Sequence, residues 1–390
     1  MSVLHWISGG ILGVAWFSRV VAAGLGMPKL PDIARPEWER SPANSTDFPR
    51  VSIIVPARNE EETIAGVLRG LVSLDYPNLE VIAVDDRSTD KTGERMDQFA
   101  SERASERLRV LHITELPAQW LGKTHAMWTA AQQATGEWLL FTDADVFFRS
   151  DALRRAITYA ETEKADHVVM FPTMVMNTPG ERMMIAFFQS LFVFGHRPWK
   201  VADPKSKDHM GVGAFNLIRR TAYDSIGSYK ALRMEVLDDM KLGKVVKEAG
   251  FAQRNVFGDG LLTLRWAKGA FGVVNNLTKN FFAIMSFQWW RTVAAAAALA
   301  YLNLMPFVGV WIATGWSRAG YTLALFSMFA IYAGMSRRSH VPAYYFFLHP
   351  VSTMLFVYTL LRSMFITLRD GGVTWRGTKY PLDELRRGLV

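Results

Sequence analysis

The sequence contains no cysteine among its 390 residues, so disulfide bonds and thiolate metal sites are excluded. This absence is compatible with a reducing compartment. None of the 8 histidines follows another at H-x-x-x-H spacing, so a structural zinc site is not expected. The net charge of +8 is not gathered into a basic helix or an RNA-binding motif. Attraction to an anionic membrane surface therefore explains the positive charge better than a nucleic-acid partner does.

Acidic residues are missing from a long stretch near the carboxyl terminus. Residues 28–270 carry nearly all of them, whereas residues 281–367 are almost continuously apolar with few charges. Because 50% of the chain is apolar, it can bury one large catalytic core and still have residues left for a bilayer. This uneven distribution predicts a soluble domain joined to a membrane domain.

An amino-terminal transmembrane anchor is predicted at residues 1–27. Residues 3–26 are apolar over a length that crosses the roughly 30 Å of bilayer hydrocarbon. A cleaved signal peptide is the alternative, but the segment lacks a basic start, is too long and contains Arg19. Residues 28–48 follow with several prolines and mixed charge, which predicts an extended linker.

The carboxyl-terminal region is predicted to hold about three transmembrane helices within residues 291–368, followed by a basic tail at 369–390. Just before them, residues 275–290 mix polar and aromatic side chains, which is typical of an interfacial helix in the headgroup region. An ordinary buried helix is the alternative. The candidate spans are residues 291–316, 320–336, which is short, and 343–367.

We expect a multi-pass protein of the cell (inner) membrane with a cytosolic catalytic domain. The distribution of its basic residues does not agree with a single number of membrane crossings. Three carboxyl-terminal crossings leave Arg337 and Arg338 inside, as the positive-inside rule favours, and place the basic tail outside. An even number of crossings, with one segment re-entrant or interfacial, would remove the conflict. The sequence does not decide between the two.

Short apolar runs alternate with helical stretches between residues 49 and 274, which predicts an α/β catalytic domain with a parallel sheet. The helical stretches are expected around residues 60–74, 90–106 and 123–134. In such a sheet, ligands bind beyond the carboxyl ends of the strands. The predicted strands are residues 51–55, 79–84, 108–113 and 137–141.

Polar clusters follow three of these strands: PARNEE from Pro56, DDRSTD from Asp85 and TDAD from Thr142. Each alone could cap a helix, and a D-x-D triplet recurs by chance. Paired carboxylates at one sheet edge instead suit a nucleotide sugar, whose base and ribose donate hydrogen bonds and whose diphosphate needs a divalent cation. Asp143 and Asp145 are the candidates for holding Mg²⁺ or Mn²⁺.

Two further residues are candidates for chemistry. Lys123 in WLGKTHA begins a predicted helix, where a cation is electrostatically unfavourable unless an anion lies nearby; a solvated surface lysine is the alternative. A hydroxyl that attacks an anomeric carbon must lose its proton, so a base is needed. Asp239 in EVLDDMKL, at the start of a predicted helix, is the candidate; an acidic helix start without a catalytic role is the alternative.

Taken in order, PARNEE, VDDRSTD, WLGKTHA, FTDAD and LDDMKLG resemble the family 2 glycosyltransferases with a GT-A fold, over roughly residues 49–270. The anchor, the W-x-G-K element and the tail GGVTWRGTKY are similar to bacterial membrane members such as the hopene-associated and carotenoid-glycosylating enzymes. The resemblance implies a nucleotide sugar, usually UDP-linked, a metal on Asp143 and Asp145, Asp239 as catalytic base, and inversion at the anomeric carbon. The residues expected to bind the nucleotide sugar are Pro56, Arg58, Glu60, Asp85, Asp86, Lys123 and Asp143.

Two positions depart from the family pattern. Where processive synthases carry Q-x-x-R-W, this chain has Leu262 in place of the glutamine, followed by Arg265 and Trp266. A polymerase that holds a growing glycan is therefore less expected. Asp238 stands where the family usually has a glutamate beside the base. Asp238, Arg265 and Trp266 are expected on the acceptor or diphosphate side.

The sequence thus predicts transfer of one sugar to the hydroxyl of a membrane lipid. A polyprenyl-phosphate glycosyltransferase and a processive polysaccharide synthase are alternatives within the same class. A receiver-like signalling module is an alternative of a different class, because it too has paired aspartates and a lysine. PARNEE would have no role in such a module.

Overall fold

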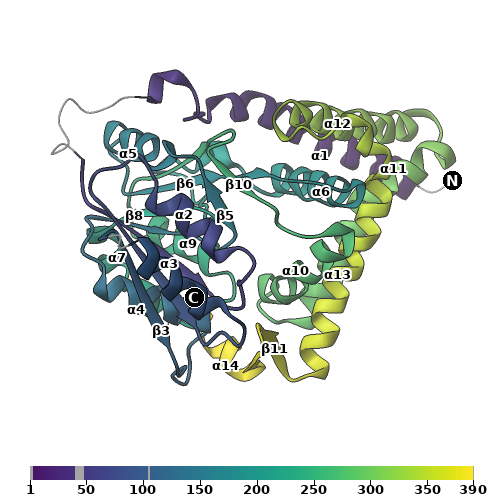
Figure 1. Ribbon diagram of the computed structural model, residues 1–390. Helices are drawn as coiled ribbons and strands as arrows, with labels where there is room; N and C mark the ends of the chain where they lie inside the picture. The colour runs from purple at the N-terminus through teal and green to yellow at the C-terminus, as the bar shows by residue number, and fades with distance from the viewer. Residues whose placement is uncertain (1–2, 40–47, 104–105, 390) are drawn as a thin grey trace. The chain divides into compact units, whose positions relative to one another are not determined.

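The computed structural model describes residues 3–39, 48–103 and 106–389 (Figure 1). The chain forms two compact units, which it enters several times. The sheet unit comprises Leu30–Val175, Lys200–Arg265 and Thr374–Val390. The helical unit comprises Met1–Lys29, Met176–Trp199 and Trp266–Val373.

A seven-stranded sheet in the order β3-β2-β1-β4-β8-β6-β9 is the centre of the sheet unit. Its first four strands are parallel, as the sequence predicts, but β8 runs antiparallel to both β4 and β6, so the sheet is mixed. The predicted parallel sheet is thus correct for β1 to β4 and wrong for the whole. The strands are β1 (Val51–Ala57), β2 (Leu79–Asp86), β3 (Leu108–Ile113), β4 (Trp138–Phe141), β6 (His167–Phe171), β8 (Asn216–Arg219) and β9 (Gln253–Phe257).

The register of the parallel strands aligns their carboxyl ends. Ala57 pairs with Asp85 between β1 and β2, and Ile54 pairs with Phe141 between β1 and β4. The polar clusters that follow these strands therefore lie at one edge of the sheet, where ligands of α/β proteins bind.

The first three helices of the sheet unit lie where the sequence predicts them. The first two are shorter than predicted, and the third begins one residue earlier. Two minor sheets accompany them, one in the order β5-β10-β7 and one formed by β11 and β12. The helices are α2 (Ile64–Val72), α3 (Thr92–Arg103), α4 (Gly122–Gln133), α5 (Ala152–Thr162), α7 (Arg220–Ser225), α8 (Ser228–Ala231), α9 (Asp238–Glu248) and α14 (Leu382–Arg387). The minor strands are β5 (Val146–Phe148), β7 (Thr173–Met174), β10 (Leu262–Leu264), β11 (Gly372–Trp375) and β12 (Thr378–Pro381).

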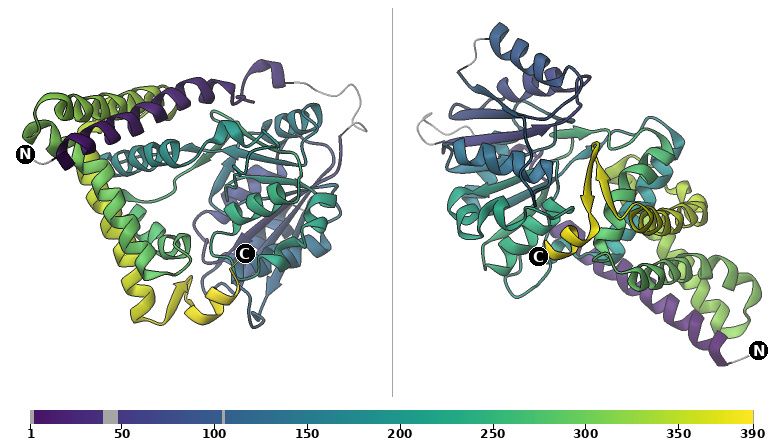
Figure 2. Two further views of the ribbon diagram at one scale, coloured as in Figure 1. Left: turned by 180° about the vertical axis from the view of Figure 1, so that it is seen from behind. Right: turned by 90° about the horizontal axis from the view of Figure 1, so that it is seen from below.

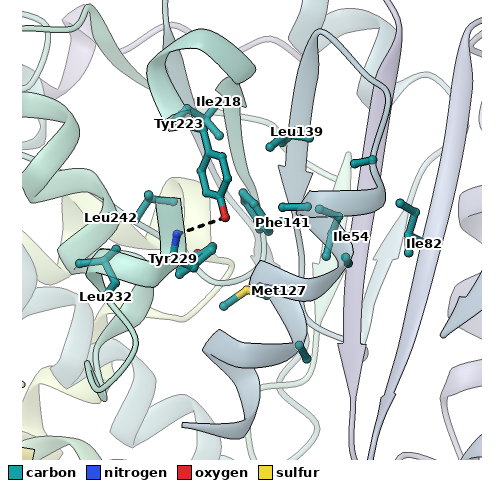
Figure 3. Packing of buried hydrophobic residues seen from close by; sticks show 14 of the residues in the cluster. Ile54, Ile82, Met127, Leu139, Phe141, Ile218, Tyr223, Tyr229, Leu232 and Leu242 are labelled. Carbon is teal, nitrogen blue, oxygen red and sulfur yellow. Dashed lines mark hydrogen bonds between the residues drawn. The ribbon is translucent and has the colours of Figure 1, made fainter. Parts of the chain in front are cut away.

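The hydrophobic core under the site packs strand residues against α4 and α9 (Figure 3). Ile54 of β1 and the alternate residues Leu139 and Phe141 of β4 belong to this cluster together with Met127 of α4. Burying each such side chain contributes roughly 2 kcal/mol. Tyr229 and Tyr223 close the cluster, and the Tyr223 hydroxyl accepts a hydrogen bond from the Tyr229 backbone N–H at 3.1 Å. This packing fixes the starts of α4 and α9 relative to the strand ends.

The helical unit contains four helices that are long and apolar enough to cross a membrane: Ile7–Lys29, Trp289–Ile312, Gly315–Ser339 and Ala343–Arg369. The middle carboxyl-terminal helix is longer than the sequence predicts. Its remaining elements and full bounds are α1 (Val3–Gly26), η1 (Met27–Lys29), α6 (Pro179–Gly195), α10 (Gly269–Ile284), α11 (Trp289–Ile312), α12 (Gly315–Ser339), η5 (Ala343–Leu348) and α13 (His349–Arg369).

Glycine lets α1 and α12 approach closely. A Cβ atom on Gly9 would lie 2.3 Å from the carbonyl oxygen of Ser317, and one on Gly320 would lie 2.3 Å from the backbone of Gly9. Small residues at such crossings are typical of helices that associate within a membrane. Residues 275–290, expected as one interfacial helix, are instead divided between the end of α10 and the start of α11, with Phe287 buried between them.

The described part of the expected linker is held firmly in the sheet unit. Ile33 is fully buried, its N–H donates to the Phe257 carbonyl at 2.9 Å, and Asp32 bridges to the same strand. Arg155 of α5, whose side chain is 4% exposed, donates to the carbonyl of Arg35 at 2.8 Å and pairs with Asp151. Residues 40–47 of the expected linker lie outside the described residues.

Arg155→Met should lower the free energy of unfolding by about 3 kcal/mol, because it leaves buried carbonyls and a carboxylate without their donor. Burial opposes ionisation of Asp151, but hydrogen bonds from Arg149 and Arg155 outweigh it and lower its pKa to about 2. A lowered carboxyl pKa adds stability above about pH 4 that is lost as the pH falls toward 2. The thermal unfolding temperatures of the natural protein and of Arg155→Met should thus differ most above pH 4. A pH-independent difference would contradict the role given to Asp151.

Candidate active site

The loops after β1 and β2 are interlocked by hydrogen bonds. Asn59 and Arg87 each adopt a φ of 55°, which turns the chain sharply at both strand ends. The Asn59 side-chain oxygen accepts from the Thr89 N–H at 2.8 Å, and the Asn59 N–H donates to the Ser88 hydroxyl at 3.1 Å. Among the described residues, Asn59 and Ser88 therefore connect the two loops to each other instead of capping the helices that follow.

The two aspartates at the end of β2 have different environments. Asp85 accepts a hydrogen bond from the Ser88 N–H at 3.1 Å and lies 3.3 Å from His112, so it shapes its own turn. Asp86 is 4% exposed and accepts from Arg87 through both oxygens, at 2.7 and 3.2 Å. A Cβ atom on Gly122 would lie 2.2 Å from the Asp86 carboxylate, so only glycine allows α4 to begin there.

Lys123 lies between two carboxylates of the site. Its amino group is 2.8 Å from Asp143 at the end of β4 and 3.4 Å from Asp238 at the start of α9. Burial disfavours the ammonium form, but Asp143, Asp238 and Asp239 outweigh that effect and hold the pKa of Lys123 well above its usual value. The anion expected beside this lysine is thus supplied by the chain's own carboxylates.

Asp145 is a partly buried carboxyl group among like charges. Burial, then Asp143 and Glu60, raise the pKa of Asp145 to about 7, while the positive charge of Arg376 partly offsets the increase. Such crowding disfavours ionisation unless a cation is added. Asp143 and Asp145 are accordingly suited to a cation.

Asp239 is oriented by two backbone donors. The N–H of Gly213 donates to one carboxylate oxygen at 2.8 Å and the N–H of Met240 to the other at 2.7 Å. A Cβ atom on Gly213 would lie 2.6 Å from Asp143 and 3.5 Å from Asp239, so both carboxylates converge on this glycine. Sequence reasoning missed Gly213; the signal available was the H-M-G-V-G segment before β8.

The remaining expected residues fall in different places. Pro56 lies within β1, and Arg58 directly after it donates to the Thr378 hydroxyl at 2.9 Å. Arg265 follows β10 in the sheet unit, whereas Trp266 belongs to the helical unit. There its ring lies 5.1 Å from that of Phe188. Their expected place on the acceptor or diphosphate side remains a prediction.

Comparisons with known proteins agree with this geometry. Residues 52–227, which include the three strand-end clusters, match the sequence profile of Glycosyl transferase family 2. A 4,4'-diaponeurosporenoate glycosyltransferase of Staphylococcus aureus (strain USA300) is 23% identical over 356 residues, 86% of this chain and 89% of that protein. One of Staphylococcus haemolyticus is 24% identical over 71% of this chain and 70% of that protein. Residues 52–227 therefore form a domain of the Glycosyl transferase family 2 type.

The fold of this glycosyltransferase is also that of a solved relative. A mannosyltransferase from Pyrobaculum calidifontis, in complex with GDP-Man and Mn²⁺, is 20% identical and superposes with a TM-score of 0.56. The similarity covers 90% of this chain and 99% of the relative. It supports a GT-A fold carried together with the apolar helices.

The residues of this glycosyltransferase would fit a divalent cation whose shell a phosphate-bearing ligand completes. No group of three His, Asp or Glu side chains close enough to hold a metal occurs within residues 3–39, 48–103 and 106–389. Mg²⁺ and similar ions are commonly bound by one or two carboxylates, with substrate phosphates and water completing the shell. The crowded pair Asp143 and Asp145 meets that requirement.

Gly213→Ala should reduce turnover about a hundredfold while the protein remains folded, because the added methyl group pushes against Asp143 and moves the donor to Asp239. Gly70→Ala in α2 is the matched control, since nothing lies within 4 Å of its Cβ position. Turnover and thermal unfolding should be measured for both. Equal turnover of Gly213→Ala and Gly70→Ala would contradict the claim that Gly213 positions Asp143 and Asp239.

Proposed function

We propose that the protein transfers one sugar from a nucleotide sugar, UDP-linked in the first instance, to the hydroxyl of a membrane lipid with inversion. The observation that carries this proposal is the convergence of Asp143 and Asp239 on Gly213. One carboxylate faces the donor diphosphate and the other can accept the proton of an acceptor hydroxyl. That arrangement suits a single displacement at the anomeric carbon.

In the proposed reaction, Asp239 removes the hydroxyl proton as the acceptor oxygen attacks the anomeric carbon. The bond from that carbon to the diphosphate oxygen breaks, and the nucleoside diphosphate leaves. A divalent cation held by Asp143 and Asp145 would neutralise the developing charge on the diphosphate. Lys123, fixed between Asp143 and Asp238, adds a positive charge on the same side.

A lipid acceptor is supported by two observations. Four helices of this chain are long and apolar enough to cross a membrane. Two relatives are named for glycosylation of a carotenoid, 4,4'-diaponeurosporenoate. A carotenoid-type lipid is therefore the first acceptor class to test, and the donor base is open because the solved relative carries GDP-Man.

We further propose that the catalytic domain is cytosolic and that the segment 266–373 crosses the membrane an even number of times. The sheet unit contains both the catalytic clusters and Thr374–Val390, and Arg376 in that tail forms an ion pair with Glu60. Three complete crossings by α11, α12 and α13 would put the tail on the opposite side from Glu60. One of these helices is then re-entrant or lies in the interface, which also resolves the conflict over the basic tail.

Single cysteines can test this topology without background, because the natural chain has none. Lys230→Cys in α8 and Lys379→Cys in β12 should react from the same side with a membrane-impermeant maleimide. The reagent reaches one side of the membrane in intact cells and the other side in sealed vesicles of inverted orientation. Labelling of these two positions from opposite sides would overturn the even count.

Asp239→Asn should reduce kcat by a factor of about 10² to 10⁴ and leave Mn²⁺-dependent nucleotide binding unchanged. Asp143→Asn should weaken that nucleotide binding. An acceptor that is already ionised, such as a polyprenyl phosphate, would not need a base and would tolerate Asp239→Asn. Titration calorimetry and turnover assays separate these effects. Unchanged turnover in both variants would show that the site is assigned wrongly.

Radiolabelled UDP- and GDP-sugars with a bacterial lipid extract test the reaction itself. The purified protein should label a lipid that extracts into organic solvent, and carotenoids should be included among the acceptors. Label found only in polymer would favour a processive synthase. No label from any donor would contradict the proposal.

A further inference from the structure

The carboxyl-terminal hairpin ends in an unusual turn. Strands β11 and β12 are joined by Arg376 and Gly377, with φ angles of +49° and +77°. Two-residue hairpin turns with both φ values positive favour Asn-Gly or Gly-Gly, because a Cβ atom crowds the backbone in this conformation and the short polar side chain of asparagine tolerates it best. An arginine at the first position is therefore held there against local preference, which points to a role for its side chain.

Contacts from this hairpin reach the donor side of the site. The Arg376 guanidinium forms an ion pair with Glu60 and donates to the backbone carbonyl of Arg58. Thr378, two residues on, accepts from the Arg58 side chain at 2.9 Å. Arg376 thus lies beside the first strand-end cluster, although more than 300 residues separate them in sequence.

The rest of the tail fixes the hairpin in place. The buried Tyr380 hydroxyl accepts a hydrogen bond at 3.0 Å from the N–H of Gly122, the first residue of α4. Leu385 of α14 is fully buried, and a Cβ atom on Gly388 would lie 2.3 Å from the Met234 side chain. Figure 2 shows this yellow end of the chain with the strands of the sheet unit. The segment from Thr378 onward is therefore packed against the sheet unit through buried contacts.

Three positively charged side chains lie near the strand ends: Lys123, Arg87 and Arg376. The side chain of Arg376 is the most exposed of the three. Lys123 is 20% exposed and lies between two carboxylates, and Arg87 is 16% exposed and engages Asp86 with two bonds. The side chain of Arg376 is 44% exposed, and its partner Glu60 is 17% exposed. A guanidinium can bind two phosphate oxygens at once, and such charge-assisted bonds are strong.

We propose that the carboxyl-terminal hairpin completes the donor site and that Arg376 binds the diphosphate of the nucleotide sugar, exchanging Glu60 for the phosphate oxygens. This inference rests on the proposed function for its ligand class, a nucleoside diphosphate. Glu60 holds the guanidinium ready when no donor is bound. Once Arg376 turns to the diphosphate, the Glu60 carboxylate can accept hydrogen bonds from the nucleotide.

Arg376→Asn tests the proposal with little risk to folding, because asparagine is favoured at this turn position. Its thermal unfolding temperature should equal or exceed that of the natural protein. Its affinity for UDP or GDP with Mn²⁺ should fall roughly tenfold to a hundredfold, as expected for loss of charge-assisted hydrogen bonds. Arg376→Lys should retain part of the affinity. Lys379→Gln, which removes a positive charge from an exposed position of the same hairpin, is the control and should bind normally.

Comparing a nucleoside diphosphate with the nucleoside alone separates a diphosphate contact from a general structural effect. Arg376→Asn should weaken binding of UDP or GDP and leave the weaker binding of uridine or guanosine unchanged. Equal diphosphate affinity of Arg376→Asn and the natural protein would overturn this inference alone. A natural protein that binds neither diphosphate would instead overturn the proposed function.

Discussion

The site depends on Lys123, which allows several carboxylates to share one buried edge of the sheet. Asp143 and Asp238 both contact its amino group, and Asp239 lies close enough to stabilise its charge. Buried like charges repel strongly unless a cation lies among them. Gly122 places the lysine by letting α4 begin against Asp86, and the core around Phe141 fixes the strand end opposite. One glycine and one ammonium group thus decide where the carboxylates after β4 and at the start of α9 can meet.

That constraint also explains why the two aspartates of the D-x-D motif differ. The ammonium group of Lys123 lies beside Asp143, whereas Asp145 is partly buried near Asp143 and Glu60, and its pKa is raised. A divalent ion bound beside Asp145 would relieve its repulsion from Asp143 and Glu60. Lys123 holds Asp143 in place through a 2.8 Å contact.

Local sequence patterns predicted the elements that build this edge, but not the contacts made across long distances. Strands β1 to β4 and the start of α9 follow from apolar runs and helix-start residues, and the paired carboxylates follow from their positions after strands. Strand β8 was not predicted, because NLIR is too short to show a period and its antiparallel pairing with β4 depends on the tertiary fold. For the same reason, Gly213 became visible only when the Asp239 carboxylate was seen to accept its N–H.

The tail shows the same limit most clearly. Arg376 follows the last long helix, and nothing local to GGVTWRGTKY indicates that it meets Glu60. The strand-end site contains residues that precede the helical segment 266–373 in sequence and residues that follow it. A fragment ending at Arg265 would retain Asp143, Asp145 and Asp239 but lack Arg376, Thr378 and Tyr380, which contact the β1 cluster and the start of α4. Because those contacts come from the end of the chain, this edge of the sheet is complete only after the apolar helices have been made. Folding of the sheet unit therefore requires a segment that is synthesised after the apolar helices, although the two units are each compact.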